Sequence, residues 1–292
     1  VPGGSSSGAA ASVAFATAVA GIGSDTGGSV RIPAAWNDLV GLKTTSELIS
    51  LEGVVPLCET FDTVGPLCRG TQDAAHLLTA LGGPETDLAG ASLVGRRLAV
   101  CQTVALDDIE DAPGRAFEAA VSKLSAAGAQ VTDVHLPMVA DMFPLSACLV
   151  TTEAYARWGE AIEANPDALF PEILGRFRAG RDFSGVEYLR AWAKLRDYRR
   201  QYAAATAGFD AVLAPTAPIL PPNKARLESD SDYYQRANLL ALRNTRIGNL
   251  MGLCALTLPT GTPSCGLMVL APPFTESRLL RLGRALEIAL GV

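Results

Sequence analysis

The feature that most constrains the fold is a strand–helix–strand pattern in the middle of the chain. Residues 96–103, RRLAVCQT, are typical of a strand, and so are residues 129–137, AQVTDVHLP. Between them, residues 111–128 place apolar side chains at helical spacing and end in a glycine. The apolar side chains of that helical face are Phe117, Val121 and Leu124. Two strands joined through a helix favour a parallel pair.

Elements of both kinds continue along the rest of the chain. Residues 9–20 predict a helix of small side chains, and residues 27–44 predict a loop that leads into the apolar piece LVGLK. Residues 139–208 are mostly helical in pattern, and a Thr cap predicts a closing helix over 275–290. Three further apolar runs predict strands: FDAVLAP, CALTLP and GLMVLAPP. We therefore predict one α/β domain over residues 1–292, with a large mixed β-sheet flanked by helices and no second domain.

Composition and charge argue against several classes of function. The net charge is −6 and no basic block occurs, which argues against nucleic acid as a partner. Residues 8–23 are apolar but too short and too rich in Ala and Gly for a membrane span, which needs about 20 apolar residues. The acidic run at 107–111 lacks the spacing of a metal-binding loop, so we expect no metal and no cofactor.

The cysteines indicate a reducing, cytoplasmic environment. None forms a C-x-x-C pair, and they lie in apolar runs, so we expect them to be buried and reduced. They are Cys58, Cys68, Cys101, Cys148, Cys254 and Cys265.

Two stretches rich in glycine and serine carry the candidate chemistry: PGGSSSGAA at 2–10 and GSDTGGSVRIPAA at 23–35. The first, in isolation, is typical of a flexible linker. The second is close to a dinucleotide fingerprint, but Pro33 follows it and a helical pattern precedes it. A nucleophilic serine needs backbone N–H groups that converge on the oxyanion, and flanking glycines permit that conformation. DTGGS therefore predicts an oxyanion nest that ends in its own nucleophile, Ser29.

The base that would activate this serine is not evident among the histidines. His76 lies in a predicted helix and His135 at a strand end, and neither has the context of a catalytic triad. Distance in sequence does not exclude them. A relay of hydroxyl and amine groups is favoured instead.

Together the two stretches resemble the amidase signature family. That family reads Gly-Gly-Ser-Ser-Gly-Gly, then Gly-(Ser/Thr)-Asp-(Thr/Ile)-Gly-Gly-Ser-(Ile/Val)-Arg-x-Pro, and here 24 residues separate Ser5 from Ser29. The resemblance continues through residues 41–75, FDAVLAPTAP and GLMVLAPPFTESRLL, so it spans the chain. The chain departs from the family at Ser7, where Gly is frequent, and at Thr44, where Pro is usual.

The resemblance implies a Ser-cisSer-Lys relay. Ser29 matches the nucleophile that is acylated, and Ser5 matches the serine that follows a cis peptide bond and shuttles the proton. The matching oxyanion donors are the backbone N–H groups of Thr26, Gly27, Gly28 and Ser29 itself.

Three more residues are expected to support this relay. Ser6 follows the shuttle serine in the first loop. Asp25 and Arg31 are expected to pair with each other and with backbone groups, which would hold the second loop in its curled conformation. The alternative for Arg31 is that it binds a carboxylate of the substrate.

In this family the lysine lies several dozen residues before the first serine loop. We therefore expect the chain to cover the C-terminal two-thirds of an amidase signature domain, with its N-terminal part missing, and to be inactive by itself. None of the lysines we considered matches the family's lysine motif: Lys43, Lys123, Lys194 and Lys224.

The favoured function is that of an amidase that hydrolyses the carboxamide of a small molecule through a seryl ester. Two alternatives stay open: the amidase or glutaminase subunit of a tRNA-dependent amidotransferase, and a non-catalytic fragment with a binding role. A homodimer is compatible with the favoured amidase function. We expect segments within 140–250 to build the substrate pocket, and the candidate aromatic side chains are Tyr155, Trp158, Tyr188 and Trp192.

Overall fold

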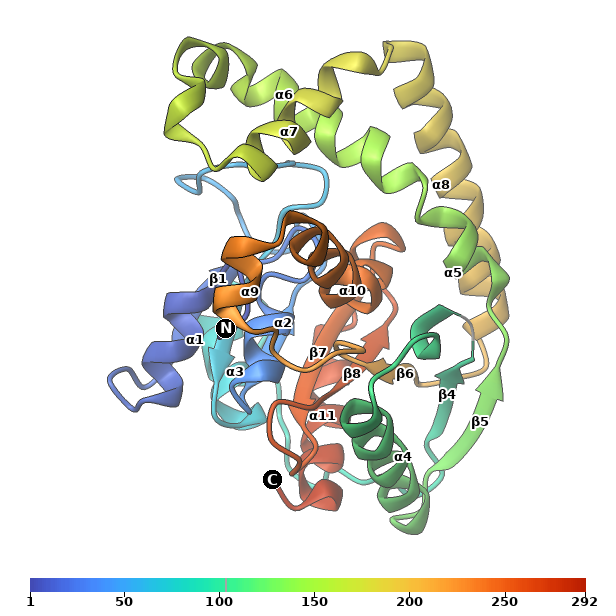
Figure 1. Cartoon of the computed structure of the whole chain (residues 1–292). Coiled ribbons are helices and arrows are strands. Elements are labelled where there is room, and N and C mark those ends of the chain that lie inside the picture. The colour runs from blue at the N-terminus through green and yellow to red at the C-terminus, as the bar shows by residue number, and fades with distance from the viewer. Residues whose placement is uncertain (103) are drawn as a thin grey trace.

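A mixed sheet of eight strands runs through the centre of the computed structural model, which describes residues 1–102 and 104–292 (Figure 1). In spatial order the strands are β1 (Gly21–Ser24), β3 (Val64–Cys68), β2 (Val40–Lys43), β7 (Cys254–Pro259), β8 (Gly266–Ala271), β6 (Ala211–Pro215), β4 (Arg97–Cys101) and β5 (Gln130–Val134). Strand β4 is parallel to both β5 and β6. The other neighbouring strands are antiparallel. The predicted large mixed sheet and the predicted parallel pair are thus confirmed.

Two hydrophobic clusters cover the two faces of the sheet, because neighbouring strand residues point to opposite sides. Leu213 belongs to one cluster, whereas Val212 belongs to the other. The first face is covered by α3 (Thr71–Ala80), α4 (Asp111–Ala126) and α11 (Glu276–Leu290). The second is covered by α2 (Arg31–Trp36), α5 (Pro137–Met142), α8 (Gly185–Thr206) and α10 (Ser231–Leu250).

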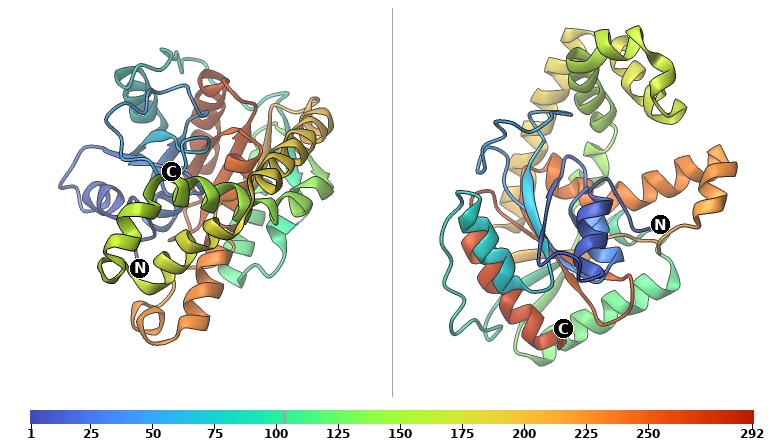
Figure 2. Two further views of the ribbon diagram at one scale, coloured as in Figure 1. Left: turned by 90° about the horizontal axis from the view of Figure 1, so that it is seen from above. Right: turned by 90° about the vertical axis from the view of Figure 1, so that its left-hand side faces the viewer.

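A helical layer rises beyond the second face. It contains α6 (Leu145–Ala164) and α7 (Pro171–Ala179), and α8 then returns along the molecule (Figures 1 and 2). The remaining helices are α1 (Ser7–Ala14) and α9 (Lys224–Ser229), with short 3₁₀ turns at Val104–Leu106, Pro166–Ala168 and Gly180–Asp182. Within the described residues, no helix combines the length and apolar character that crossing a bilayer requires.

The predicted elements before residue 70 were partly wrong. The first helix ends at Ala14 rather than near 20, and the strands β1 and β3 were not predicted. Helix α2 lies inside the predicted loop, with Pro33 at its third position. A proline is tolerated there because N–H groups of the first helical turn have no partner within the helix. The predicted strand 96–103 appears as β4, and its last residue, 103, lies outside the described residues.

Only part of α8 packs into the core. Leu195 is fully buried and Tyr198 is buried, whereas Leu189 is 66% exposed. All six cysteines are buried, as predicted.

Candidate active site

The two serine loops meet at one cavity. Ser5 and Ser29 both line this space of about 820 Å³, together with Thr26 and Gly27. The backbone N–H of Ser6 donates to the carbonyl of Ser29 across 3.1 Å, which ties the first loop to the second. The Gly4–Ser5 peptide bond is cis, which confirms that prediction. Within residues 1–102 and 104–292, no hydrogen bond joins the hydroxyls of Ser5 and Ser29, so the contact expected of a proton relay between them is not formed in this structure.

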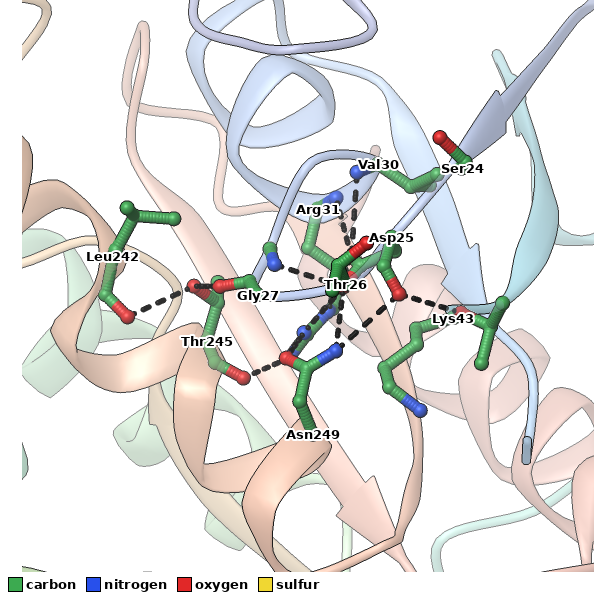
Figure 3. A network of polar contacts seen from close by, with 12 residues as sticks. Ser24, Asp25, Thr26, Gly27, Val30, Arg31, Lys43, Leu242, Thr245 and Asn249 are labelled. Atoms are coloured by element: carbon green, nitrogen blue, oxygen red, sulfur yellow. Dashed lines mark hydrogen bonds and ion pairs between the residues drawn. The ribbon is translucent and has the colours of Figure 1, made fainter. Parts of the chain in front are cut away.

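A buried ion pair lies beneath the second loop. The side chains of Asp25 and Arg31 are completely buried, and Arg31 Nη2 lies 2.9 Å from Asp25 Oδ1 (Figure 3). Burial raises the pKa of Asp25, but the charge and hydrogen bonds of Arg31 outweigh it, and the pKa settles at about 2. The pairing predicted from the sequence is confirmed.

Arg31 has no donor left for a ligand. A guanidinium has five N–H groups. Two donate to the Asp25 carboxylate, one to Asn249 Oδ1 (2.6 Å), and Nη1 donates to the Thr245 carbonyl (2.7 Å) and the Met268 sulfur (3.3 Å). Because every donor is engaged in the core, this structure does not support the alternative role of Arg31 as a carboxylate ligand.

Helix α10 holds the loop from the other side. Thr245 Oγ1 donates to the carbonyl of Gly27 across 2.7 Å, and Asn249 Nδ2 donates to Asp25 Oδ1 across 2.9 Å (Figure 3). Gly28 has a φ of +133°, and a Cβ there would overlap Thr245. Sequence reasoning missed Thr245 and Asn249. The available signal was a pair of polar side chains four residues apart, just before an apolar strand. This spacing places both side chains on the same face of a helix.

Three backbone N–H groups of the loop are directed at no partner within the described part of the chain: those of Thr26, Gly27 and Ser29. The same three residues line the cavity. The N–H of Gly28, predicted from the sequence as a fourth oxyanion donor, instead donates to Asp25 Oδ1 across 2.8 Å, and Gly28 is buried. The first three groups therefore form a nest that can receive an oxyanion.

The side chain of Thr26 is fixed from the opposite direction. Its hydroxyl donates to the carboxylate of Asp62. Asp62 in turn accepts from the backbone N–H groups of Leu57 (2.8 Å) and Cys58 (3.0 Å). The loop is thus held by carboxylates on two sides, and its backbone has little freedom to turn away from the cavity.

The remaining cavity wall is mostly apolar and comes from α2, α6, α7 and α10. None of the four aromatic candidates from the sequence lines it within the described residues. Trp158 donates to the Pro56 carbonyl and Tyr188 to Glu153, so they brace other parts of the fold. Trp192 stacks on Phe61, which does line the cavity, at 5.2 Å between ring centroids. The aromatic side chains in the wall are Trp36, Phe61, Phe143, Phe177 and Tyr234.

The four lysines considered above all lie outside the cavity lining, as do both histidines, over the described residues. Lys43 is completely buried, and its ammonium donates to the carbonyls of Thr44 (2.8 Å) and Leu253 (2.9 Å). Burial and the nearby Arg31 lower the pKa of Lys43 to about 8. Among residues 1–102 and 104–292, no three His, Cys, Asp or Glu side chains are grouped so as to hold a metal ion.

Comparison with known proteins places this geometry in a family. The model of the amidase family matches residues 1–280. The chain is 37% identical over 300 aligned positions to 2-amino-5-chloromuconic acid deaminase of Comamonas testosteroni, a match that covers 100% of this chain and 65% of that protein. The chain thus spans about two-thirds of the length of that relative.

Two solved structures share the fold. One, described as an amidase, gives a TM-score of 0.88 at 29% identity and covers 98% of this chain and 66% of that one. The other is a glutamyl-tRNA(Gln) amidotransferase subunit from Thermotoga maritima, with a TM-score of 0.82 at 28% identity and the same coverage, 98% and 66%. Because the family model matches nearly the whole chain, the chain belongs to the amidase signature family.

Proposed function

We propose that this protein hydrolyses a carboxamide of a small molecule through an ester formed on Ser29. The observation that carries the proposal is the meeting of Ser5, Ser29 and three unbonded backbone N–H groups in one cavity. A nucleophile, a neighbouring hydroxyl and an oxyanion nest are the parts that acyl transfer needs.

The reaction runs in two halves. Ser29 Oγ attacks the amide carbon and passes its proton to Ser5, while the N–H groups of Thr26, Gly27 and Ser29 stabilise the oxyanion. The C–N bond then breaks as the nitrogen takes a proton, and ammonia or an amine leaves. Water attacks the resulting ester, which releases the carboxylic acid and restores the Ser29 hydroxyl. Each of these N–H donors contributes about 3 kcal/mol of transition-state stabilisation by analogy with measured oxyanion holes.

Ser5 needs a base beyond it. Lys43, Lys123, Lys194 and Lys224 all lie away from the cavity. We therefore propose that the base is the lysine that, by the family resemblance, precedes the first serine loop. Ser6 supports the relay through its backbone bond to Ser29, and Asp25 and Arg31 support it by fixing the second loop.

A second candidate is the amidase subunit of a tRNA-dependent amidotransferase. The curated relatives include a glutamyl-tRNA(Gln) amidotransferase subunit from Acidobacterium capsulatum at 31% identity, of which the match covers 68%. This candidate predicts that ammonia is released only when partner subunits are present. We favour the first candidate because the relative with 37% identity is named as a deaminase of a small acid. We also propose a cytoplasmic location, a domain that takes in all of residues 1–292, and a homodimer.

The test measures ammonia release from a panel of small primary amides, by the protein as its gene encodes it in full. We expect Ser29→Ala to lower kcat at least about 10⁴-fold and Ser5→Ala to lower it about 10²- to 10⁴-fold. The matched control is Ser12→Ala, because the Ser12 hydroxyl donates to the Ala9 carbonyl in α1, outside the cavity. Full turnover by the Ser29→Ala variant would contradict the proposal. Turnover that requires an added partner subunit would favour the second candidate.

A further inference from the structure

Two arginines stand out in the apolar wall of the cavity. Arg246 comes from α10 and Arg176 from α7, about seventy residues earlier, and both line the space that also holds Ser29. Over the described residues, the lining contains no Asp or Glu side chain. Most binding pockets are apolar with a few placed polar groups that select the ligand, and these two cations are such groups.

Arg246 lies next to the oxyanion nest. A Cβ built on Gly27 would be 3.9 Å from Arg246 Cγ and 3.8 Å from a methyl group of Leu242. Leu242, Arg246 and Leu250 follow one another at four-residue spacing, so they share the cavity face of α10. The side chain that begins beside the nest therefore extends along the same cavity.

The donors of Arg246 are available to a ligand. In the part of the chain that the structure describes, this guanidinium has no hydrogen bond and no ion pair. Arg31, on the far side of the same loop, has a partner for all five of its N–H groups. A partly buried guanidinium without partners is unfavourable, because its lost hydration is not replaced.

Arg176, which is exposed, adds a second positive charge that forms no ion pair within residues 1–102 and 104–292. Its Nη2 donates to the hydroxyl of Tyr234 (3.2 Å), and its guanidinium carbon lies 5.7 Å from the centre of that ring. Glu172, one turn earlier on α7, instead accepts from the hydroxyl of Ser231 (3.3 Å) and forms no ion pair within residues 1–102 and 104–292. Burial, followed by the positive charge of Arg176, lowers the pKa of Arg246 to about 10.

From this we infer that the substrate is an amide whose other end carries a carboxylate, and that Arg246, assisted by Arg176, binds that carboxylate. A planar guanidinium fork matches the two oxygens of a carboxylate, and such charge-assisted pairs are the strong hydrogen bonds of proteins. An entering carboxylate would give Arg246 a hydrogen-bond acceptor, which it has nowhere among the described residues, and would bring a negative charge to the two arginines. The substrate class is therefore the monoamide of a dicarboxylic acid. The position of the amide at Ser29 rests on the proposed function. The anion site at Arg246 does not depend on it.

The test compares acids with neutral amides of equal chain length. The pairs are succinamate with butanamide, glutaramate with pentanamide, and adipamate with hexanamide, and the readout is the ratio of the two kcat/KM values within each pair. For the unaltered protein we expect at least one acid to be preferred about 10- to 100-fold, since a site built for a polar group rejects analogues without it. Arg246→Gln should bring that ratio close to one, and Arg246→Lys should retain part of it because the charge stays while the fork is lost.

The matched control is Arg236→Gln. Arg236 lies on the same helix, is exposed and does not line the cavity, so the ratio should stay at its original value. No preference for any acid in the unaltered protein would overturn the inference. So would a preference that survives in Arg246→Gln, or one that Arg236→Gln removes equally.

A binding experiment separates this inference from the proposed reaction. Calorimetric titration of the Ser29→Ala variant with succinate, glutarate and adipate measures the anion site without turnover. We expect one of these dicarboxylates to bind, and the double variant with Arg246→Gln to bind it at least about 10-fold more weakly, while its thermal midpoint confirms that it is folded. If no amide is hydrolysed but this binding is seen, the reaction is wrong and the anion site stands. If amides are hydrolysed but no dicarboxylate binds, the anion site is wrong and the reaction stands.

Discussion

Removal of Asp25 should destabilise the protein more than any loss of a surface charge, because it leaves Arg31 without its counter-charge in the core. In Asp25→Ala the Arg31 guanidinium stays fully buried. The bonds that disappear include those from Gly28 N (2.8 Å), Arg31 Nε (3.0 Å), Arg31 Nη2 (2.9 Å) and Asn249 Nδ2 (2.9 Å). The breaking of one partner of a buried ion pair costs about 3–5 kcal/mol, and this is the loss of unfolding free energy that we expect.

Urea unfolding at pH 7, followed by circular dichroism, measures this loss. The cycle contains Asp25→Ala, Arg31→Met and the double variant. Because the double variant leaves neither member of the Asp25–Arg31 pair without the other, it should be more stable than the sum of the two single losses by about 2 kcal/mol or more. The control is Asp197→Ala, which removes an exposed pair with Arg200 on α8 and should cost less than about 1 kcal/mol. A loss below about 1 kcal/mol for Asp25→Ala, or strict additivity, would refute this reasoning.

Three further predictions test the loop and its surroundings. Gly28→Ala should lower the unfolding temperature by several degrees and lose turnover, because its Cβ would overlap Thr245 at a φ of +133°. In the control Gly27→Ala the new Cβ has no neighbour closer than 3.8 Å, so its unfolding temperature should stay close to that of the unaltered protein. The pKa of Asp25 is about 2 against an ordinary 3.8, so its ionised form contributes about 2 kcal/mol to the free energy of unfolding above pH ~4. This contribution is lost as the pH falls through about 2, and the acid unfolding curve of Asp25→Ala should lack the corresponding fall in stability. The pKa of Lys43 is about 8 against 10.5, so the unfolded chain holds more protons between those values and stability should rise with pH there. The difference in urea midpoint between the unaltered protein and Lys43→Met should show this slope, and the absence of a slope would contradict the lowered pKa of Lys43.

The elements that could be predicted were those with strong periodicity. The helix at 111–126 and its flanking strands have clear apolar patterns, and the apolar runs of β6, β7 and β8 are long enough to stand out. Strands β1 and β3 were missed because each is short and carries glycine, and β3 also carries Pro66. Each has a single β-branched residue and no aromatic one, too few to signal a strand, and they become strands by pairing in the sheet, β1 with β3 and β3 also with β2.

The residues of the site also fall into those that the sequence could predict and those that it could not. Ser5, Ser29 and the Asp25–Arg31 pair lie in local motifs, so the sequence could predict them. Thr245 and Arg246 lie more than 200 positions further along and reach the loop only through the packing of α10, so no local motif links them to the serine loops. The aromatic candidates failed for a related reason, because helical spacing places side chains on one face but does not say which neighbour that face contacts.

The central claim is that Ser29 is the residue that becomes acylated. Its most direct test is incubation of the whole protein with a fluorophosphonate, followed by digestion and mass spectrometry. Our account predicts one adduct, on the peptide that contains Ser29, and no adduct in the Ser29→Ala variant. An adduct on Ser5 or on another residue, with Ser29 unmodified, would contradict it.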